Sequence, residues 1–308
     1  MIISRRLRYL FVLCILAIAA PPHVYALDPV PRQWSHLPLD TNFFGMAYAY
    51  TEADIGLDPV LRTEDVEMEL DTWGVKYIRS FEAFGKSARV DLTQAYQEAE
   101  WTGLLDGAPA AVSRHGPSDT FVRIAINLYV APPLGGKEYA QYRQNAGSET
   151  IVGAALAVRL PTGDYKKDKL LNLGQNRFVL RPQLGLMHTW GQWSIDMTGE
   201  VAFYGDNDEF FNGNKREQDP MLLVYGSLIH TFRPGHWLGA SFGFDSGGEG
   251  TINGVEKNDH RKDLGAALSY AYPVTRTSSI VTRYLRTETQ EDIGNDSDTL
   301  SVNFSLAW

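Results

Sequence analysis

The chain has 308 residues and is acidic, with 37 Asp and Glu against 28 Lys and Arg and a formal net charge of −9. Because an acidic chain repels phosphate groups, nucleic acid is excluded as an expected partner. The only cysteine, Cys14, excludes an internal disulfide framework. The mean hydropathy of −0.23 fits a soluble protein, and it equally fits a membrane barrel whose lipid-facing and lumen-facing residues alternate.

Residues 1–26 have the pattern of a signal peptide. Arg5, Arg6 and Arg8 precede an apolar stretch over residues 9–20, and a cleavage site follows that ends at Ala26. Cleavage there removes the three arginines, so the mature chain would carry a net charge of −12 and no cysteine. An uncleaved anchor is the alternative, but the apolar stretch is short for a membrane span.

After the leader, apolar and polar residues alternate with a period of two in segment after segment. This period is typical of strands that have two different environments on their two faces. The clearest segments are residues 44–50, 122–130, 152–160, 193–203, 264–272 and 301–308. Weaker ones are residues 66–78, 90–96, 178–188, 222–231, 237–244 and 280–286. The pattern predicts about twelve strands, an even number such as single-chain bacterial barrels require.

We therefore predict an all-β fold, a transmembrane antiparallel β-barrel in the outer membrane of a Gram-negative cell. The barrel would comprise residues 41–308, and residues 27–40 would form a periplasmic N-terminal segment. The sequence does not decide whether that segment hangs in the periplasm or enters the lumen. In the last strand, Val302, Phe304, Leu306 and Trp308 share one face. A terminal aromatic residue in such a strand resembles the signal read by the outer-membrane insertion machinery, which is therefore an expected partner.

The predicted connections alternate in length, as expected when both termini are periplasmic. The long, polar, external candidates are residues 51–65, 101–118, 161–176, 205–219, 245–259 and 287–297. The short turns are residues 191–192, 233–235 and 273–275. Residues 131–149 are long where a short turn is expected, and their core at residues 137–142 could form a short plug or cap helix.

The second half of the chain also carries a series of short motifs in a characteristic order. They lie at residues 161–165, 171–174, 176–178, 181–182, 191–193, 206–207, 218–220, 235–237, 247–248, 253–254 and 308. In order and spacing they resemble the Gram-negative family named after the meta-pathway of phenol degradation, often labelled outer-membrane transporters. The resemblance covers residues 132–308 and implies an outer-membrane barrel that passes small, often aromatic or hydrophobic compounds. No catalytic residues belong to the family pattern.

Charged side chains on the inward face are the candidate functional residues. A charge at the bilayer midplane costs about 2–4 kcal/mol, so such residues should avoid the lipid face. Facing acidic and basic walls would select solutes by charge. Alternatively, the side chains form paired networks that fill the interior. The predicted pore-lining residues are Glu67, Glu69, Asp71, Arg123, Arg159, Arg181, Asp196, Glu200 and Arg283.

The expected function is passive passage of small solutes, which requires no ATP, cofactor or metal. Catalysis is not expected. One rival is a lipid hydrolase that uses His188 or His230 as a base, and another is a non-conducting structural or surface-binding barrel. Residues 206–209 and 291–298 are acidic but lack the ordered spacing of a calcium loop. We expect them to form a solvated rim that contacts lipopolysaccharide. Lipopolysaccharide and membrane lipid are therefore expected partners as well.

Overall fold

The computed structural model describes residues 29–56, 63–105 and 107–308. The signal peptide predicted over residues 1–26 lies outside the described residues. The long strands are β1 (Asn42–Gly56), β2 (Thr63–Ala83), β3 (Lys86–Leu105), β5 (Thr120–Tyr129), β6 (Ser148–Leu160), β7 (Val179–Trp190), β8 (Trp193–Tyr204), β11 (Met221–Arg233), β12 (His236–Gly247), β15 (Arg261–Pro273), β16 (Ser278–Thr289) and β17 (Gly294–Ala307).

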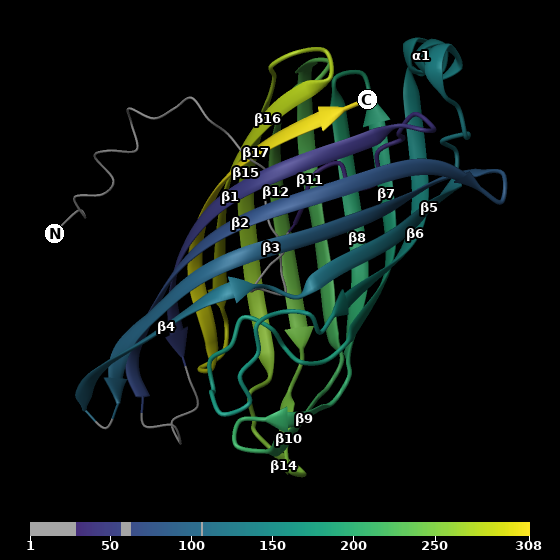
Figure 1. The fold of residues 1–308 in the computed structure, drawn as a ribbon. Helices are drawn as coiled ribbons and strands as arrows, with labels where there is room; N and C mark the ends of the chain where they lie inside the picture. The colour runs from purple at the N-terminus through teal and green to yellow at the C-terminus, as the bar shows by residue number, and fades with distance from the viewer. Residues whose placement is uncertain (1–28, 57–62, 106) are drawn as a thin grey trace, which may run out of the picture.

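These strands close into one antiparallel barrel (Figure 1). Each strand pairs with the next along the chain, and β1 pairs with β17 from Phe43 opposite Ala307 to Gly56 opposite Gly294. Closure leaves the ring without a free edge, so backbone groups are satisfied inside the sheet as lipid requires. The predicted twelve-stranded barrel is confirmed. No helix within the described ranges is long and apolar enough to cross a membrane.

The two ends of the barrel differ in their connections. One end carries α1 and the C-terminus, and we call it the turn end (Figure 1). The other carries a small four-stranded sheet, and we call it the loop end. The elements outside the ring are β4 (Ala108–Pro117), α1 (Gly136–Asn145), β9 (Asn207–Phe210), β10 (Asn214–Gln218), β13 (Gly250–Ile252) and β14 (Val255–Glu256).

Several predicted loops are partly strand, which corrects the prediction for residues 101–118, 205–219 and 245–259. β4 pairs with the loop-end half of β3, and β9, β10, β13 and β14 pair with one another. These segments were predicted as loops because they lack apolar alternation. A strand beyond the membrane has no lipid-facing side, so it does not need that alternation. The helix suggested within residues 131–149 is present as α1.

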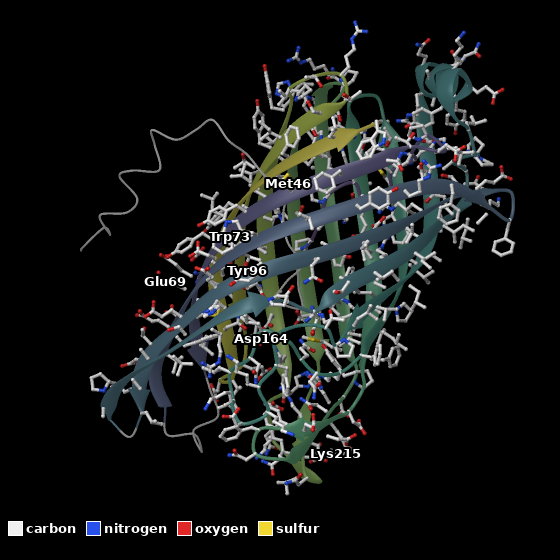
Figure 2. All side chains as sticks on the ribbon, viewed as in Figure 1. Met46, Glu69, Trp73, Tyr96, Asp164 and Lys215 are labelled. Carbon is white, nitrogen blue, oxygen red and sulfur yellow. The ribbon has the colours of Figure 1, made fainter. Side chains whose placement is uncertain are left out.

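Alternation of the side chains confirms the predicted faces along most of the barrel. In β1, Met46 and Tyr48 are exposed outside while Ala47 and Ala49 are buried inside. Figure 2 shows Met46 and Trp73 on the outer surface. Trp73 packs beside Tyr48, with ring centroids 5.8 Å apart. Aromatic rings of this kind suit the boundary between lipid and water.

The predicted turn at residues 191–192 is confirmed between β7 and β8. Trp190 and Trp193 face each other across it, and Gly191 has a φ of 54°. Two-residue hairpins use turns with positive φ because their twist matches that of the strands, and glycine adopts such angles without steric cost.

The predicted orientation of β2 is wrong. Glu67, Glu69 and Asp71 point outward, whereas Met68 and Leu70 are buried inside. β2 has 21 residues, about twice the 9–11 that a tilted membrane strand needs. Its loop-end half therefore extends beyond the lipid, where the outer face meets water and carries the acids (Figure 1).

Residues 29–40, predicted as a periplasmic segment, enter the lumen and do not hang in the periplasm. Pro29, Trp34 and His36 are buried, and Trp34 is only 1% exposed. The segment fills the barrel interior with the Trp34 ring, and its backbone groups form hydrogen bonds with side chains of the barrel wall.

Candidate functional site

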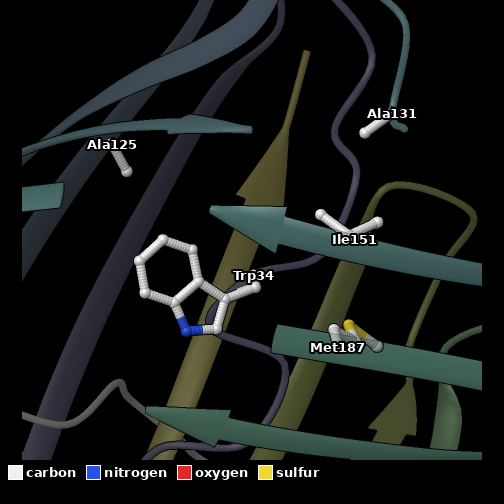
Figure 3. Packing of buried hydrophobic residues seen from close by; sticks show 5 residues of the cluster. All are labelled: Trp34, Ala125, Ala131, Ile151 and Met187. Carbon is white, nitrogen blue, oxygen red and sulfur yellow. The ribbon is translucent and has the colours of Figure 1, made fainter. Parts of the chain in front are cut away.

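The indole of Trp34 is the anchor of the N-terminal segment, which we call the plug (residues 29–40). It lies beside Ile151 and Met187 within a cluster of buried residues (Figure 3). Its Nε1 donates a hydrogen bond to Thr198 Oγ1 at 2.8 Å. A Cβ atom at Gly185 would lie 1.9 Å from the ring and one at Gly153 would lie 2.4 Å from it, so both positions require glycine.

Hydrogen bonds tie the rest of the plug to widely separated strands. Arg283 Nη2 of β16 donates to the Pro29 carbonyl at 3.0 Å, and Arg89 Nη2 of β3 donates to the Gln33 carbonyl at 2.6 Å. The Tyr225 hydroxyl of β11 donates to Gln33 Oε1 at 3.0 Å. Because the partners surround the lumen, the plug crosses its section and does not lie along one wall.

The turn end holds the other side of the plug through α1. His36 Nε2 contacts the Pro132 carbonyl at 2.8 Å, and the Tyr139 hydroxyl of α1 donates to the His36 carbonyl at 2.8 Å. His36 Nδ1 lies 4.0 Å from Glu149, which also pairs with Arg143. Burial lowers the pKa of His36 from its usual value of 6.5. The plug is thus docked with a neutral imidazole at its turn-end side.

Most charges near the plug are paired. Asp91 lies 3.3 Å from both Arg89 Nε and Arg123 Nη1 and 3.9 Å from Lys76 Nζ. Arg123 also donates to Gln183 Oε1 at 2.7 Å and stacks over Trp34, with its Cζ atom 4.9 Å from the ring centroid. This network stabilises the plug and fills the space around it.

The structure places most of the predicted pore-lining residues in the lumen, and their role in passage stays a prediction. Arg181 forms an ion pair with Glu200, and the Asp196 carboxylate accepts a hydrogen bond from the backbone N–H of Arg32. The residues with inward side chains are Arg123, Arg159, Arg181, Asp196, Glu200 and Arg283. Glu67, Glu69 and Asp71 are not brought together with them.

A cavity of about 270 Å³ opens at the loop end, and we call it the arginine cavity. Among the described residues that line it, five are arginines and one, Asp259, is acidic. The arginines are Arg159, Arg177, Arg181, Arg216 and Arg261. The last strand residues before the loops and the loops themselves supply them, so the cavity lies above the plug on the loop-end side.

A second cavity of about 180 Å³ adjoins the first and shares Arg159, Asn172 and Gln175 with it. Half of its lining residues are apolar, and the others include Gln97, Ser118 and Asp119. The apolar residues are Met68, Leu70, Ala99, Trp101, Phe121 and Leu173. We call this second cavity the apolar cavity. The inward apolar face of β2, unexpected from the sequence, thus forms a compartment beside the arginine cavity.

Some of these residues carry a recognisable signal in the sequence, and others do not. Arg177 lies in one of the family motifs, at residues 176–178, but it falls between the predicted loop of residues 161–176 and the predicted strand of residues 178–188, and no role was predicted for it. Gly153 and Gly185 lie opposite each other on β6 and β7. A glycine inside a strand can mark a site where another group packs closely against the backbone. No local pattern marks Trp34.

The two histidines considered as catalytic bases lie on the outside of the barrel at the turn end. His188 stacks on Trp190 with ring centroids 5.4 Å apart and contacts Thr150 Oγ1 at 2.7 Å. His230 packs on Trp193 with centroids 4.5 Å apart. Within the described ranges neither contacts a serine hydroxyl, and both belong to an aromatic belt.

Comparison with solved structures agrees with this fold. An outer membrane channel from Pseudomonas putida F1 superposes with a TM-score of 0.75 at 18% identity, covering 91% of this chain and 100% of that one. The transport unit of the autotransporter AIDA-I from Escherichia coli has a TM-score of 0.52 at 8% identity, covering 91% and 92% of the two chains. No curated protein sequence matches.

A family model described as "Putative MetA-pathway of phenol degradation" matches residues 60–304. That span includes all barrel strands except β1 and the last residues of β17. The exposed apolar band, the closed ring and this match together show that the chain is an outer-membrane β-barrel of the phenol-degradation family.

Proposed function

We propose that the barrel is a passive channel for small solutes, with the loop end facing the outside of the cell. The observation that carries the proposal is the division of the lumen: open cavities lie on the loop-end side and a docked plug lies below them. Passage would then require the plug to shift away from the wall of the lumen. Such a channel needs neither ATP nor a cofactor, because the solute moves down its own gradient.

The cavities favour solutes of the size of one aromatic ring. An engineered apolar cavity of about 150 Å³ holds benzene, and the apolar cavity has about 180 Å³. Hydrophobic or aromatic compounds are therefore the proposed solutes, consistent with the family description.

The environment of the barrel supplies its other proposed partners. Outward apolar side chains contact membrane lipid, and the acidic residues of the loop end would meet lipopolysaccharide. The alternating face that ends at Trp308 is the proposed recognition signal for the insertion machinery. We assign no catalytic role, because the belt packing of His188 and His230 accounts for both rings.

Conductance in planar lipid bilayers tests the proposal. We expect small openings from the wild-type protein and larger ones from Trp34→Ala, because the indole that anchors the plug is removed. Trp73→Ala removes an indole from the outer surface and is the matched control, with conductance like wild type. Heat-modifiable gel mobility verifies that each variant is folded. Folded wild-type and Trp34→Ala barrels that both stay silent would contradict the proposal.

A further inference from the structure

The arginines that line the arginine cavity differ in whether a carboxylate contacts them. Arg181 is paired with Glu200, and Arg261 Nη2 lies 2.6 Å from Asp263 Oδ2. Within the described part of the chain, no carboxylate lies within ion-pair distance of Arg177 or Arg216. Asp119 and Asp259 act on Arg177 and Arg216 only from beyond ion-pair distance, so neither guanidinium group has a described carboxylate in contact with it.

Arg177 is held in place by neutral groups. It is 6% exposed, its Cζ atom stacks 4.7 Å from the ring centroid of Tyr204, and it donates to the side-chain oxygens of Gln175 and Gln218. Its Nη1 is buried and has no hydrogen-bond partner among the described residues. A buried donor without an acceptor is costly, which makes this atom a ready position for an anionic oxygen.

We propose that the arginine cavity binds a small organic anion through its carboxylate, with the apolar body of the ligand directed toward the apolar cavity. The inference rests on the proposed channel function and names a substrate class for it: aromatic carboxylates. Arginine offers a planar fork of donors that matches the two oxygens of a carboxylate. Arg177 and Arg216 supply the charge, and Asn172 and Gln175, which line both cavities, supply polar edges between them.

The remaining wall of the cavity suits a ring beside the charge. Tyr204 and Phe210 line it, each covered on one side by an arginine, and Leu223 adds an aliphatic surface. Burial and the neighbouring Arg216 lower the pKa of Arg177 to about 9. Burying the charged Arg177 side chain therefore costs desolvation free energy, and a bound anion would offset that cost by pairing with the guanidinium group.

Titration calorimetry on the full-length mature protein in detergent tests the proposal with three probes. Benzoate carries ring and carboxylate, benzyl alcohol carries the ring without the charge, and sulfate carries charge without a ring. We expect benzoate to bind and the other two to bind at least about tenfold more weakly, since a charged hydrogen bond is lost with one and apolar burial with the other. Equal binding of benzyl alcohol, or of sulfate, would overturn the proposed ligand class.

Variants locate the site. Arg177→Gln should raise the Kd for benzoate by about tenfold or more, and Arg216→Gln, in the small sheet outside the ring, should do so without touching the barrel wall. The matched control is Arg233→Gln, because Arg233 also stacks on a tyrosine, Tyr272, but at the turn end. An unchanged Kd in both cavity variants would overturn the site. Binding is measured without a membrane, so a barrel that binds benzoate yet never conducts would refute only the channel.

Discussion

The two halves of the lumen use charge in different ways. Around the plug, Lys76, Arg89 and Arg123 each lie within ion-pair distance of the shared Asp91 carboxylate. Arg123 also stacks over the Trp34 ring. In the arginine cavity, Arg177 and Arg216 rest on aromatic rings and neutral amides. Paired charge fills and stiffens an interior, whereas a guanidinium group beside an open volume, with no carboxylate in contact, is suited to a ligand. The same residue type therefore has a structural role in one half and a binding role in the other.

The largest expected effect comes from breaking the paired half. Asp91→Asn keeps the shape of the side chain but leaves Lys76, Arg89 and Arg123 without their shared carboxylate. Removing one partner of a buried ion pair costs about 3–5 kcal/mol, so the urea midpoint of the barrel refolded into lipid vesicles should fall clearly. Glu69→Gln is the control on the outer face of β2, where we expect a change within about 0.5 kcal/mol. An equal loss of stability in the two variants would mean that the Asp91 network does not stabilise the barrel more than an exposed side chain does.

A smaller effect is expected from overfilling the cradle of the plug. Gly185→Ala places a methyl group 1.9 Å from the Trp34 indole, so the ring must move. Overpacking of this kind costs about 1–3 kcal/mol. We expect higher acrylamide quenching of tryptophan fluorescence and larger bilayer conductance. Gly199→Ala on β8 is the matched control, because a Cβ there meets nothing within 4 Å. If both variants behave like wild type, the plug is not held by the indole.

How far the sequence predicts this molecule depends on where each strand lies relative to lipid. The twelve ring strands follow from the period of two, since lipid outside and polar lumen inside impose it. The same rule places Arg123, Arg181 and Glu200 inward correctly. It fails at Glu67 and Glu69, where the environments of the two faces reverse: water lies outside, and the apolar cavity lies inside.

The parts that could not be predicted depend on contacts between segments far apart in the chain. Trp34 lies in no periodic segment, and its position is fixed by glycines more than 100 residues away, Gly153 and Gly185. Arg177 becomes a cavity residue only because Gln218, on β10, folds back over the loop that carries it. Such long-range placements leave no local alternation, so only the folded barrel reveals them.

The weakest expected effect is a pH dependence of plug docking through His36. Its folded pKa is below 6.5, so the docked state favours the neutral ring. Docking is then fully stabilised above pH 6.5, and the stabilisation is lost as the pH falls below that value, since the released histidine takes up a proton more readily. The groups that face the ring are Glu149, Arg143, Tyr139 and Tyr142.

Bilayer conductance measured from about pH 7.5 down to about pH 5 should therefore rise in the wild-type protein. His36→Gln keeps a donor for the Pro132 carbonyl but does not titrate, so its conductance should stay flat. His260→Gln, at an exposed loop-end position, should retain the wild-type curve. A dependence shared by the wild type and His36→Gln would place the titrating group elsewhere, and Asp196, whose carboxylate accepts a hydrogen bond from the plug backbone at Arg32, would be the next residue to replace.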